Sequence, residues 1–201
     1  GIGIVRLSGD QSFNIASKVF KGAKIESTRD IENRKLTYGH IVDNDNIIDE
    51  VFMAFMKSPY TYTRENMVEI YCHGGIISVQ KVLELILRNG ARLADRGEFT
   101  KRAFLNGRLD LSQAEAVIDI IKSKTDKSFQ VSIDQLEGSL SNKIRELRDI
   151  LLSMIAHIEV SIDFPDEDVE VSTINELEEN ALEIKEKIRA LLSTADRGKI
   201  L

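Results

Sequence analysis

The sequence lacks the features that would place it in several common protein classes. It has one cysteine in 201 residues, so no disulfide can form within the chain. Only two prolines are present, and no segment is rich in glycine and serine, which argues against long disordered linkers. No apolar run approaches the ~20 residues that a membrane-spanning helix needs. These absences predict a globular, cytoplasmic protein that does not associate with membranes.

Motifs for several kinds of active site are also absent. No G-x-x-x-x-G-K-[ST] phosphate loop occurs, because Gly198-Lys199 is followed by Ile200. The first glycines do not form G-x-G-x-x-G, because Arg6 occupies the third glycine position. No Cys/His cluster has zinc spacing and no Ser-His-Asp triad is visible. We therefore predict no catalytic and no metal-binding residue in this chain.

The overall charge limits the kinds of partner. The formal net charge is -6, and an acidic chain binds nucleic acid poorly through bulk electrostatics. Any contact with nucleic acid therefore requires a local basic patch or another domain.

The first half of the chain alternates strand-like and helix-like segments. Asp43-Asn-Asp-Asn46 has the composition of a hairpin turn, and Asn89-Gly90 is a good helix end. Asp10 or Ser12 is a candidate helix cap, and 93–94 is a candidate start of a further strand. Strands are predicted at 2–7, 36–42, 47–56 and 67–72, and helices at about 12–20 and 76–88.

Beyond about Ser112 only helical patterns remain. Ser112-Gln-Ala-Glu115 has the form of a capping box for the first helix. A second helix carries one apolar stripe from Leu136 to Ile158, which Gly138 interrupts mildly, and a third starts at Thr173. The fold class is therefore α+β, with an N-terminal α/β domain over 1–115 and a partial helical domain over 116–201. The helices can form a minimal bundle, or a larger one completed by residues beyond this chain or by a second subunit.

Some charged side chains can be interpreted in two ways. Glu69, in a strand-like segment, is either a solvent-facing residue or an acceptor for a ligand with two adjacent N–H donors. Glu98 and Arg102 are spaced for an ion pair that stabilises a helix. The acidic segment Asp163–Asp168 is interpreted as a structural turn around Pro165, in preference to a cation site.

Three segments resemble one protein family. They are Arg96-Gly-Glu-Phe-Thr-Lys-Arg-Ala-Phe-Leu-Asn-Gly-Arg-Leu-Asp-Leu-Ser-Gln-Ala-Glu-Ala116, Tyr62-Thr-Arg-Glu-Asn-Met-Val-Glu-Ile-Tyr-Cys-His-Gly-Gly75 and Ile162-Asp-Phe-Pro-Asp-Glu-Asp168. In the order in which they occur along the chain, they resemble the tRNA-modifying GTPases called MnmE or TrmE, in the part before the GTPase domain. The resemblance runs along the whole chain.

The resemblance implies a ligand and its contacts. In the family the N-terminal domain binds a tetrahydrofolate derivative, such as 5-formyltetrahydrofolate, and forms a homodimer. Arg6, Glu69 and Arg108 align with folate-contacting positions, and some members have lysine at the third. Which arginine meets which part of the ligand stays open.

The resemblance also implies a larger enzyme. The complete proteins hydrolyse GTP with Mg²⁺ and K⁺ in a domain that this chain lacks, so the chain alone should be inactive. With the FAD-containing partner MnmG (GidA), they add a carboxymethylaminomethyl or aminomethyl group at C5 of the wobble uridine of tRNA. Two alternatives remain: a stand-alone folate-dependent one-carbon transferase, and a structural dimerisation module without a ligand.

Overall fold

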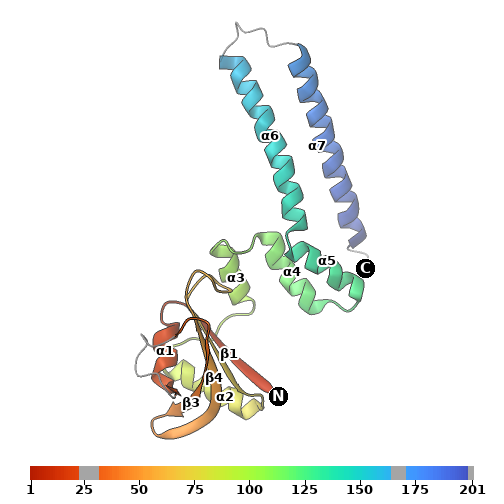
Figure 1. Cartoon of the computed structure of the whole chain (residues 1–201). Coiled ribbons are helices and arrows are strands. Elements are labelled where there is room, and N and C mark those ends of the chain that lie inside the picture. Colours follow the sequence, from red (N-terminus) through yellow and green to blue (C-terminus); the bar gives the residue numbers. More distant parts are fainter. Residues whose placement is uncertain (23–31, 164–170, 199–201) are drawn as a thin grey trace. The chain divides into compact units, whose positions relative to one another are not determined.

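The computed structural model describes residues 1–22, 32–163 and 171–198. The chain divides into two compact units, Gly1–Ala114 and Glu115–Leu201 (Figure 1).

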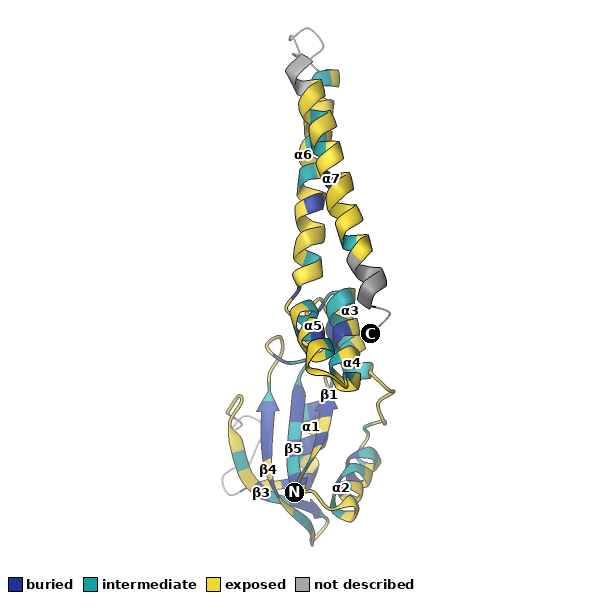
Figure 2. Ribbon diagram, turned by 90° about the vertical axis from the view of Figure 1, so that its right-hand side faces the viewer, coloured by how far each residue is buried: buried dark blue, intermediate teal, exposed yellow. Residues whose placement is uncertain are grey.

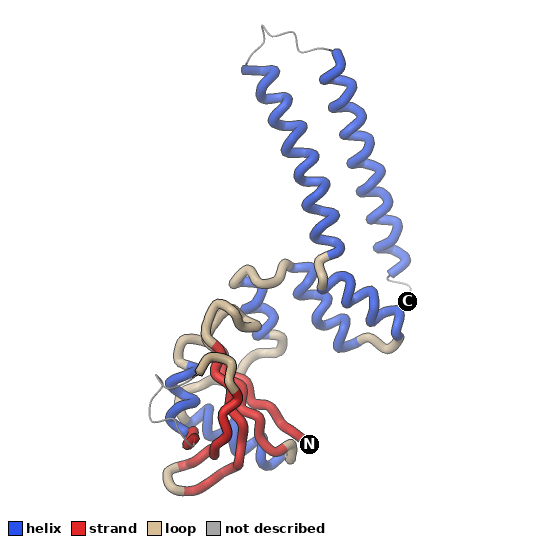
Figure 3. Tube along the Cα trace, in the orientation of Figure 1, coloured by secondary structure: helices blue, strands red, loops and turns tan. Residues whose placement is uncertain are grey.

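The first unit is built on one antiparallel sheet with the strand order β1-β5-β4-β3-β2 (Figure 3). β3 and β4 form a hairpin, with Asn44 in the left-handed conformation at its turn. Its elements are β1 (Ile2–Ser8), α1 (Ser12–Val19), β2 (Phe20–Gly22), β3 (Leu36–Asp43), β4 (Asn46–Met56), β5 (Met67–His73), α2 (Ile76–Arg88) and α3 (Glu98–Leu105).

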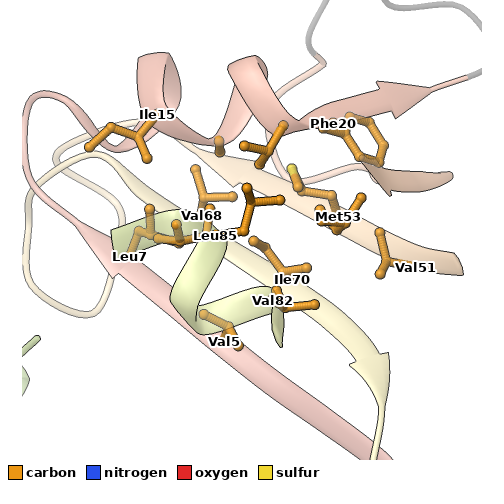
Figure 4. Packing of buried hydrophobic residues seen from close by; sticks show 14 of the residues in the cluster. Val5, Leu7, Ile15, Phe20, Val51, Met53, Val68, Ile70, Val82 and Leu85 are labelled. Carbon is orange, nitrogen blue, oxygen red and sulfur yellow. The ribbon is translucent and has the colours of Figure 1, made fainter. Parts of the chain in front are cut away.

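One face of this sheet carries the core, and α1 and α2 cover it (Figure 4). Alternate residues of a strand point to opposite faces, so Val68 and Ile70 enter the core while Glu69 between them points away. The core consists of buried side chains from both helices and all five strands, among them Val5, Leu7, Ile15, Phe20, Ile41, Val51, Met53, Phe55, Val68, Ile70, Val82, Leu85 and Ile86.

The second unit is helical. α6 (Ser139–Asp163) and α7 (Val171–Gly198) lie side by side as an antiparallel pair (Figure 1). α5 (Asp126–Leu136) packs against α6. α4 (Leu111–Lys122) begins in the last residues of the first unit and continues into the second. Most of the surface of α6 and α7 is exposed (Figure 2).

The predicted α+β class is confirmed, and each of the four predicted strands and the helix over 76–88 is present. Three details differ. Residues 93–94 lie in a loop, β2 follows α1 directly, and the residue before α1 is Gln11. The Ser12 hydroxyl donates instead to the Asn66 carbonyl (2.9 Å), which ties the start of α1 to the sheet.

The helical predictions need three corrections. The predicted continuous helix from Leu136 to Ile158 is broken at Gly138, whose φ of +89° ends α5 before α6 begins. The capping box lies two residues earlier than predicted, because the Asp110 carboxylate accepts from the Gln113 amide and the Gln113 side chain accepts from the Asp110 amide. α7 begins at Val171, not at Thr173. The predicted turn around Pro165 lies outside the described residues.

Candidate ligand-binding site

Arg6 and Glu69 meet on the face of the sheet opposite the core. They are direct cross-strand partners on β1 and β5, where neighbouring Cβ atoms lie close together. The Arg6 Nε and Nη2 atoms each lie 2.7 Å from Glu69 Oε1. The Arg6 side chain is 42% exposed and that of Glu69 only 14%, so the carboxylate lies below the guanidinium. Two of the three predicted site residues are therefore in direct contact.

Tyr71 is the second donor to Glu69. It lies two residues further along β5, on the same face, and its hydroxyl donates to Glu69 Oε2. This hydrogen bond to the carboxylate, together with burial, raises the pKa of Tyr71 above its ordinary value, so the phenol stays protonated and keeps donating. Glu69 Oε1 thus faces two nitrogens of Arg6 and Oε2 accepts from Tyr71, so the free acceptor capacity of the carboxylate lies on Oε2.

Arg108 is positioned by the way α3 ends. Gly107 has a φ of +70°, its amide donates to the Phe104 carbonyl (2.9 Å), and the Arg108 amide donates to the Ala103 carbonyl (2.8 Å). This is the Schellman pattern, in which the residue after α3 and its glycine is fixed by two backbone hydrogen bonds. The Arg108 guanidinium then lies over the Tyr62 ring, 4.5 Å from its centroid.

α3 contacts both arginines or their partners. The Phe99 ring lies 6.0 Å from the Arg6 guanidinium carbon, and the Thr100 hydroxyl is 3.0 Å from the Tyr62 hydroxyl. Arg6 and Arg108 therefore approach the same short helix, Arg6 from the sheet and Arg108 from the loop behind it.

A chain of ion pairs fixes α3. Arg102 donates to Glu98 Oε1 from Nε (3.0 Å) and Nη2 (2.8 Å), so the predicted Glu98–Arg102 pair is confirmed. Nη1 of Arg102 also reaches both oxygens of Glu65 (3.0 and 2.9 Å). Arg92 Nη1 donates to Glu98 (2.8 Å), and this hydrogen bond is the main cause of a Glu98 pKa well below its ordinary value of 4.5. These pairs orient the helix on which the candidate site depends.

A cavity of about 470 Å³ lies at the free edge of β1. β1, α2 and the segment 90–99 enclose it, and Arg6 and Phe99 are at its border. Its volume falls in the range of small-molecule pockets. Arg6 therefore lies between this cavity and the open face that holds Glu69, whereas Arg108 is not among the residues that line the cavity.

Comparison with known proteins identifies the family. Residues 1–108 match the family described as the GTP-binding protein TrmE N-terminus, and residues 111–201 match the MnmE helical domain. The chain belongs to the MnmE (TrmE) family. Curated relatives named tRNA modification GTPase MnmE include those of Alkaliphilus metalliredigens and Clostridioides difficile, each 57% identical, and that of Bacillus subtilis, 52% identical. Each alignment covers 100% of this chain and 44% of the relative, so the chain spans less than half the length of these MnmE proteins.

The sequence patterns did not reveal three aromatic residues of the candidate site. Tyr71 was detectable, because a residue two positions from Glu69 on a strand shares its face. Phe99 and Tyr62 were not detectable, since their contacts with Arg6 and Arg108 depend on where α3 docks on the sheet.

A second polar cluster lies at the end of β5. Asp49 accepts a hydrogen bond from the His73 amide (2.9 Å), lies 2.6 Å from His73 Nδ1 and accepts from the Ser78 hydroxyl. Burial opposes ionisation of Asp49, but the hydrogen bonds from Ser78 and His73 outweigh it and lower its pKa. A carboxylate at the centre, with no imidazole between it and the serine, cannot activate that hydroxyl. We therefore assign the cluster to fixing the turn between β5 and α2.

The neighbouring Cys72 is buried, with its thiol 3.4 Å from the Gly3 carbonyl oxygen, and burial raises its pKa. Cys72 is buried and the adjacent His73 is exposed, so their side chains point to opposite faces of the sheet. Within the described residues no group of three or more His, Cys, Asp or Glu side chains could hold a metal ion. None of the helices in those residues is long and apolar enough to cross a membrane.

Proposed function

We propose that this chain is the folate-binding and helical part of a tRNA modification GTPase. The observation that carries the proposal is the Arg6–Glu69 pair on the open face of the sheet, next to α3 and Arg108, in a chain that belongs to the MnmE family. Curated relatives that match the whole chain carry the name tRNA modification GTPase MnmE.

The pair fits a folate in its chemistry. The pterin ring of a folate presents adjacent N–H donors, which a carboxylate accepts in parallel, and Tyr71 holds the Glu69 carboxylate in place. The glutamate tail of a folate carries carboxylates, which a planar guanidinium binds through two parallel hydrogen bonds. Arg6 and Arg108, both anchored over aromatic rings, are the candidates for this contact. When bound, the tetrahydrofolate derivative supplies a one-carbon unit.

The proposal is tested by calorimetric titration with 5-formyltetrahydrofolate. Glu69→Gln keeps the shape of the side chain but removes half of its acceptor capacity and leaves Arg6 without an ionic partner, so we expect a loss of affinity of at least tenfold. Glu84→Gln, at an exposed position of α2, is the matched control and should bind as the wild type does. Equal affinity in Glu69→Gln would remove Glu69 from the site.

We also propose that the first unit forms a homodimer through the open face of its sheet. Large apolar side chains on this face are exposed, which is uncommon over a contiguous area in monomers: Ile4, Leu36, Tyr38 and Phe52. Phe52→Glu should convert the dimer into a monomer in sedimentation-velocity experiments. Ile77→Glu, on an exposed position of α2, should not change the sedimentation coefficient. A wild-type monomer at micromolar concentration would contradict the assignment.

The activity of the complete protein is a further part of the proposal. We infer that the rest of the protein hydrolyses GTP with Mg²⁺ and K⁺, and that a flavoprotein of the MnmG (GidA) type cooperates with it in the cytoplasm. The product would be 5-carboxymethylaminomethyl or aminomethyl uridine at the wobble position of tRNA. The two alternatives make different predictions: a stand-alone one-carbon transferase would act without the helical unit, and a structural module would dimerise without binding folate.

A further inference from the structure

Three segments of the first unit bring together a group of cations beside Arg108. They are residues 32–35, the loop 57–65 that follows β4, and the turn 106–108. The Lys57 amide donates to Asn33 Oδ1 (2.8 Å), and the Arg34 guanidinium donates to the Tyr60 carbonyl. Arg64 Nη1 donates to the Asn106 carbonyl (3.0 Å), which joins the loop to the turn that carries Arg108. We call Arg34, Lys57, Arg64, Arg108 and the exposed Tyr60 the basic loop surface.

The positive charge of the basic loop surface is not neutralised locally. Arg34 and Arg64 donate to backbone carbonyls, which carry no net charge, and Arg108 stacks on Tyr62. Among the described residues, the acidic side chains next to these cations in sequence have other partners: Glu32 pairs with Lys35, Glu65 binds Arg102 and Ser8, and Asp110 accepts from Ser112 and Gln113. These positively charged side chains have no acidic partner among the contacts above, although the chain as a whole has a net charge of -6. The positive charge is therefore concentrated locally on this surface.

The backbone gives a second indication. Arg34 and Arg64 have φ values of +64° and +59°, in the left-handed region that residues other than glycine rarely adopt. An asparagine or glycine would adopt these conformations more easily. Arginine at both positions, with exposed guanidinium groups on one surface, indicates a use for the side chains beyond the turn itself.

Tyr60 completes the surface with a chemically different group. Its side chain is 76% exposed, while Thr61 and Thr63 on either side of Tyr62 are buried and hold the loop rigid. An exposed aromatic ring between cations matches the way proteins hold single-stranded nucleic acid, in which cations bind phosphates and rings stack on unpaired bases. An acidic peptide would provide negative charge for the cations but no nucleobase to stack on the Tyr60 ring.

We propose that the basic loop surface binds the sugar-phosphate backbone of a single-stranded RNA loop, and that Tyr60 stacks on one of its bases. The choice of RNA over DNA rests on the proposed function, in which the substrate is a tRNA. Since Arg108 belongs both to this surface and to the candidate folate site, the bound loop lies next to the one-carbon donor.

The test is fluorescence anisotropy of a labelled RNA hairpin with an unpaired loop, titrated with this chain. Tyr60→Ala should weaken binding about 5- to 150-fold, the range measured for loss of one base–aromatic stack. Lys57→Gln should weaken binding and lower the slope of log affinity against log salt by about one, because one phosphate contact is lost. Lys81→Gln, an exposed lysine of α2, is the control and should bind as the wild type does.

Separate outcomes overturn this inference and the proposed function. The inference is overturned if the hairpin does not bind, if Tyr60→Ala and Lys57→Gln bind as the wild type does, or if polyglutamate competes as well as unlabelled RNA. Folate titration of the same two variants is the second readout. Normal folate binding with no RNA binding would leave the proposed function standing, whereas no folate binding by the wild-type chain would remove the folate site irrespective of the RNA result.

Discussion

The two units of the chain differ in how completely they bury their apolar side chains. The first unit closes a core from two helices and a sheet, and its central side chains are almost fully buried. In the second unit, the long pair α6 and α7 buries Leu147 and Ile184 deeply, while Leu151, Ile155 and Ile188 along the same helices stay exposed. A helix with an apolar stripe is stable when the stripe packs against something. The first unit is therefore self-sufficient, and the second has apolar surface for further partners.

Charge separates the units in the same way. Residues 1–114 contain 16 Lys and Arg against 14 Asp and Glu, whereas residues 115–201 contain 11 against 19. The net charge of -6 thus comes from the helical unit alone. The candidate site and the basic loop surface lie on the unit that is slightly positive.

Separating the two units should give the largest effect. A fragment of residues 1–110 should unfold cooperatively with a melting temperature close to that of the first unit in the whole chain, because its core is intact. A fragment of residues 111–201 should show helix content that declines gradually on heating. Circular dichroism of both fragments makes the comparison, and a sharp transition in the helical fragment would contradict it.

Removing one side chain of matched type from each unit should give the next largest effect. Ile70 is fully buried and Ile155 is 49% exposed. Ile70→Ala should destabilise the first unit by about 2–5 kcal/mol, because it leaves a cavity in a packed core. Ile155→Ala should cost less than about 1 kcal/mol. Urea unfolding monitored by circular dichroism measures both, and equal losses would mean that the helical unit packs as well as the first.

Gly107 and Gly138 allow the same comparison for the backbone. Both have positive φ, so alanine at either position should cost about 1–2 kcal/mol. Only Gly107→Ala should also weaken 5-formyltetrahydrofolate binding, because it disturbs the turn that positions Arg108. Calorimetry separates the two effects, and a loss of folate affinity in Gly138→Ala would show that the variants act through stability alone.

The smallest expected effect concerns Glu98. Its pKa is lowered in the folded protein, so its contribution to stability is fully present above the ordinary value of 4.5 and is lost as the pH falls through the folded value. Glu98→Gln should therefore lower the melting temperature at neutral pH, and the difference from the wild type should shrink below about pH 4.5. A constant difference in Glu98→Gln would remove the ion-pair explanation.

The contrast between the units also explains which predictions from sequence succeeded. In the sheet, the alternation around Glu69 determines the face of each side chain, so the strand and the placement of the carboxylate on the face opposite the core follow from local pattern. The positions of Arg6 and Glu69 as cross-strand partners do not follow from it, because register depends on pairing between residues that are 63 positions apart in sequence. In the helical unit the apolar residues keep their helical spacing across Gly138, although the helix itself ends there. The spacing shows which residues lie on one face but not where the backbone turns. Asp110 rather than Ser112 caps α4 for a similar reason: both have suitable side chains, and the backbone exit from the Gly107 turn decides between them.

The exposed apolar face and the Arg6–Glu69 pair lie on the same side of the sheet, and this has a thermodynamic consequence. If a second copy covers that side, a ligand at Glu69 and the neighbouring protomer become coupled, and the coupling acts equally in both directions. Apparent ligand affinity would then vary with protein concentration, and added ligand would shift the association constant by the same factor. Ligand titrations at two protein concentrations would thus measure the coupling free energy between ligand binding and dimer formation, which neither measurement gives alone.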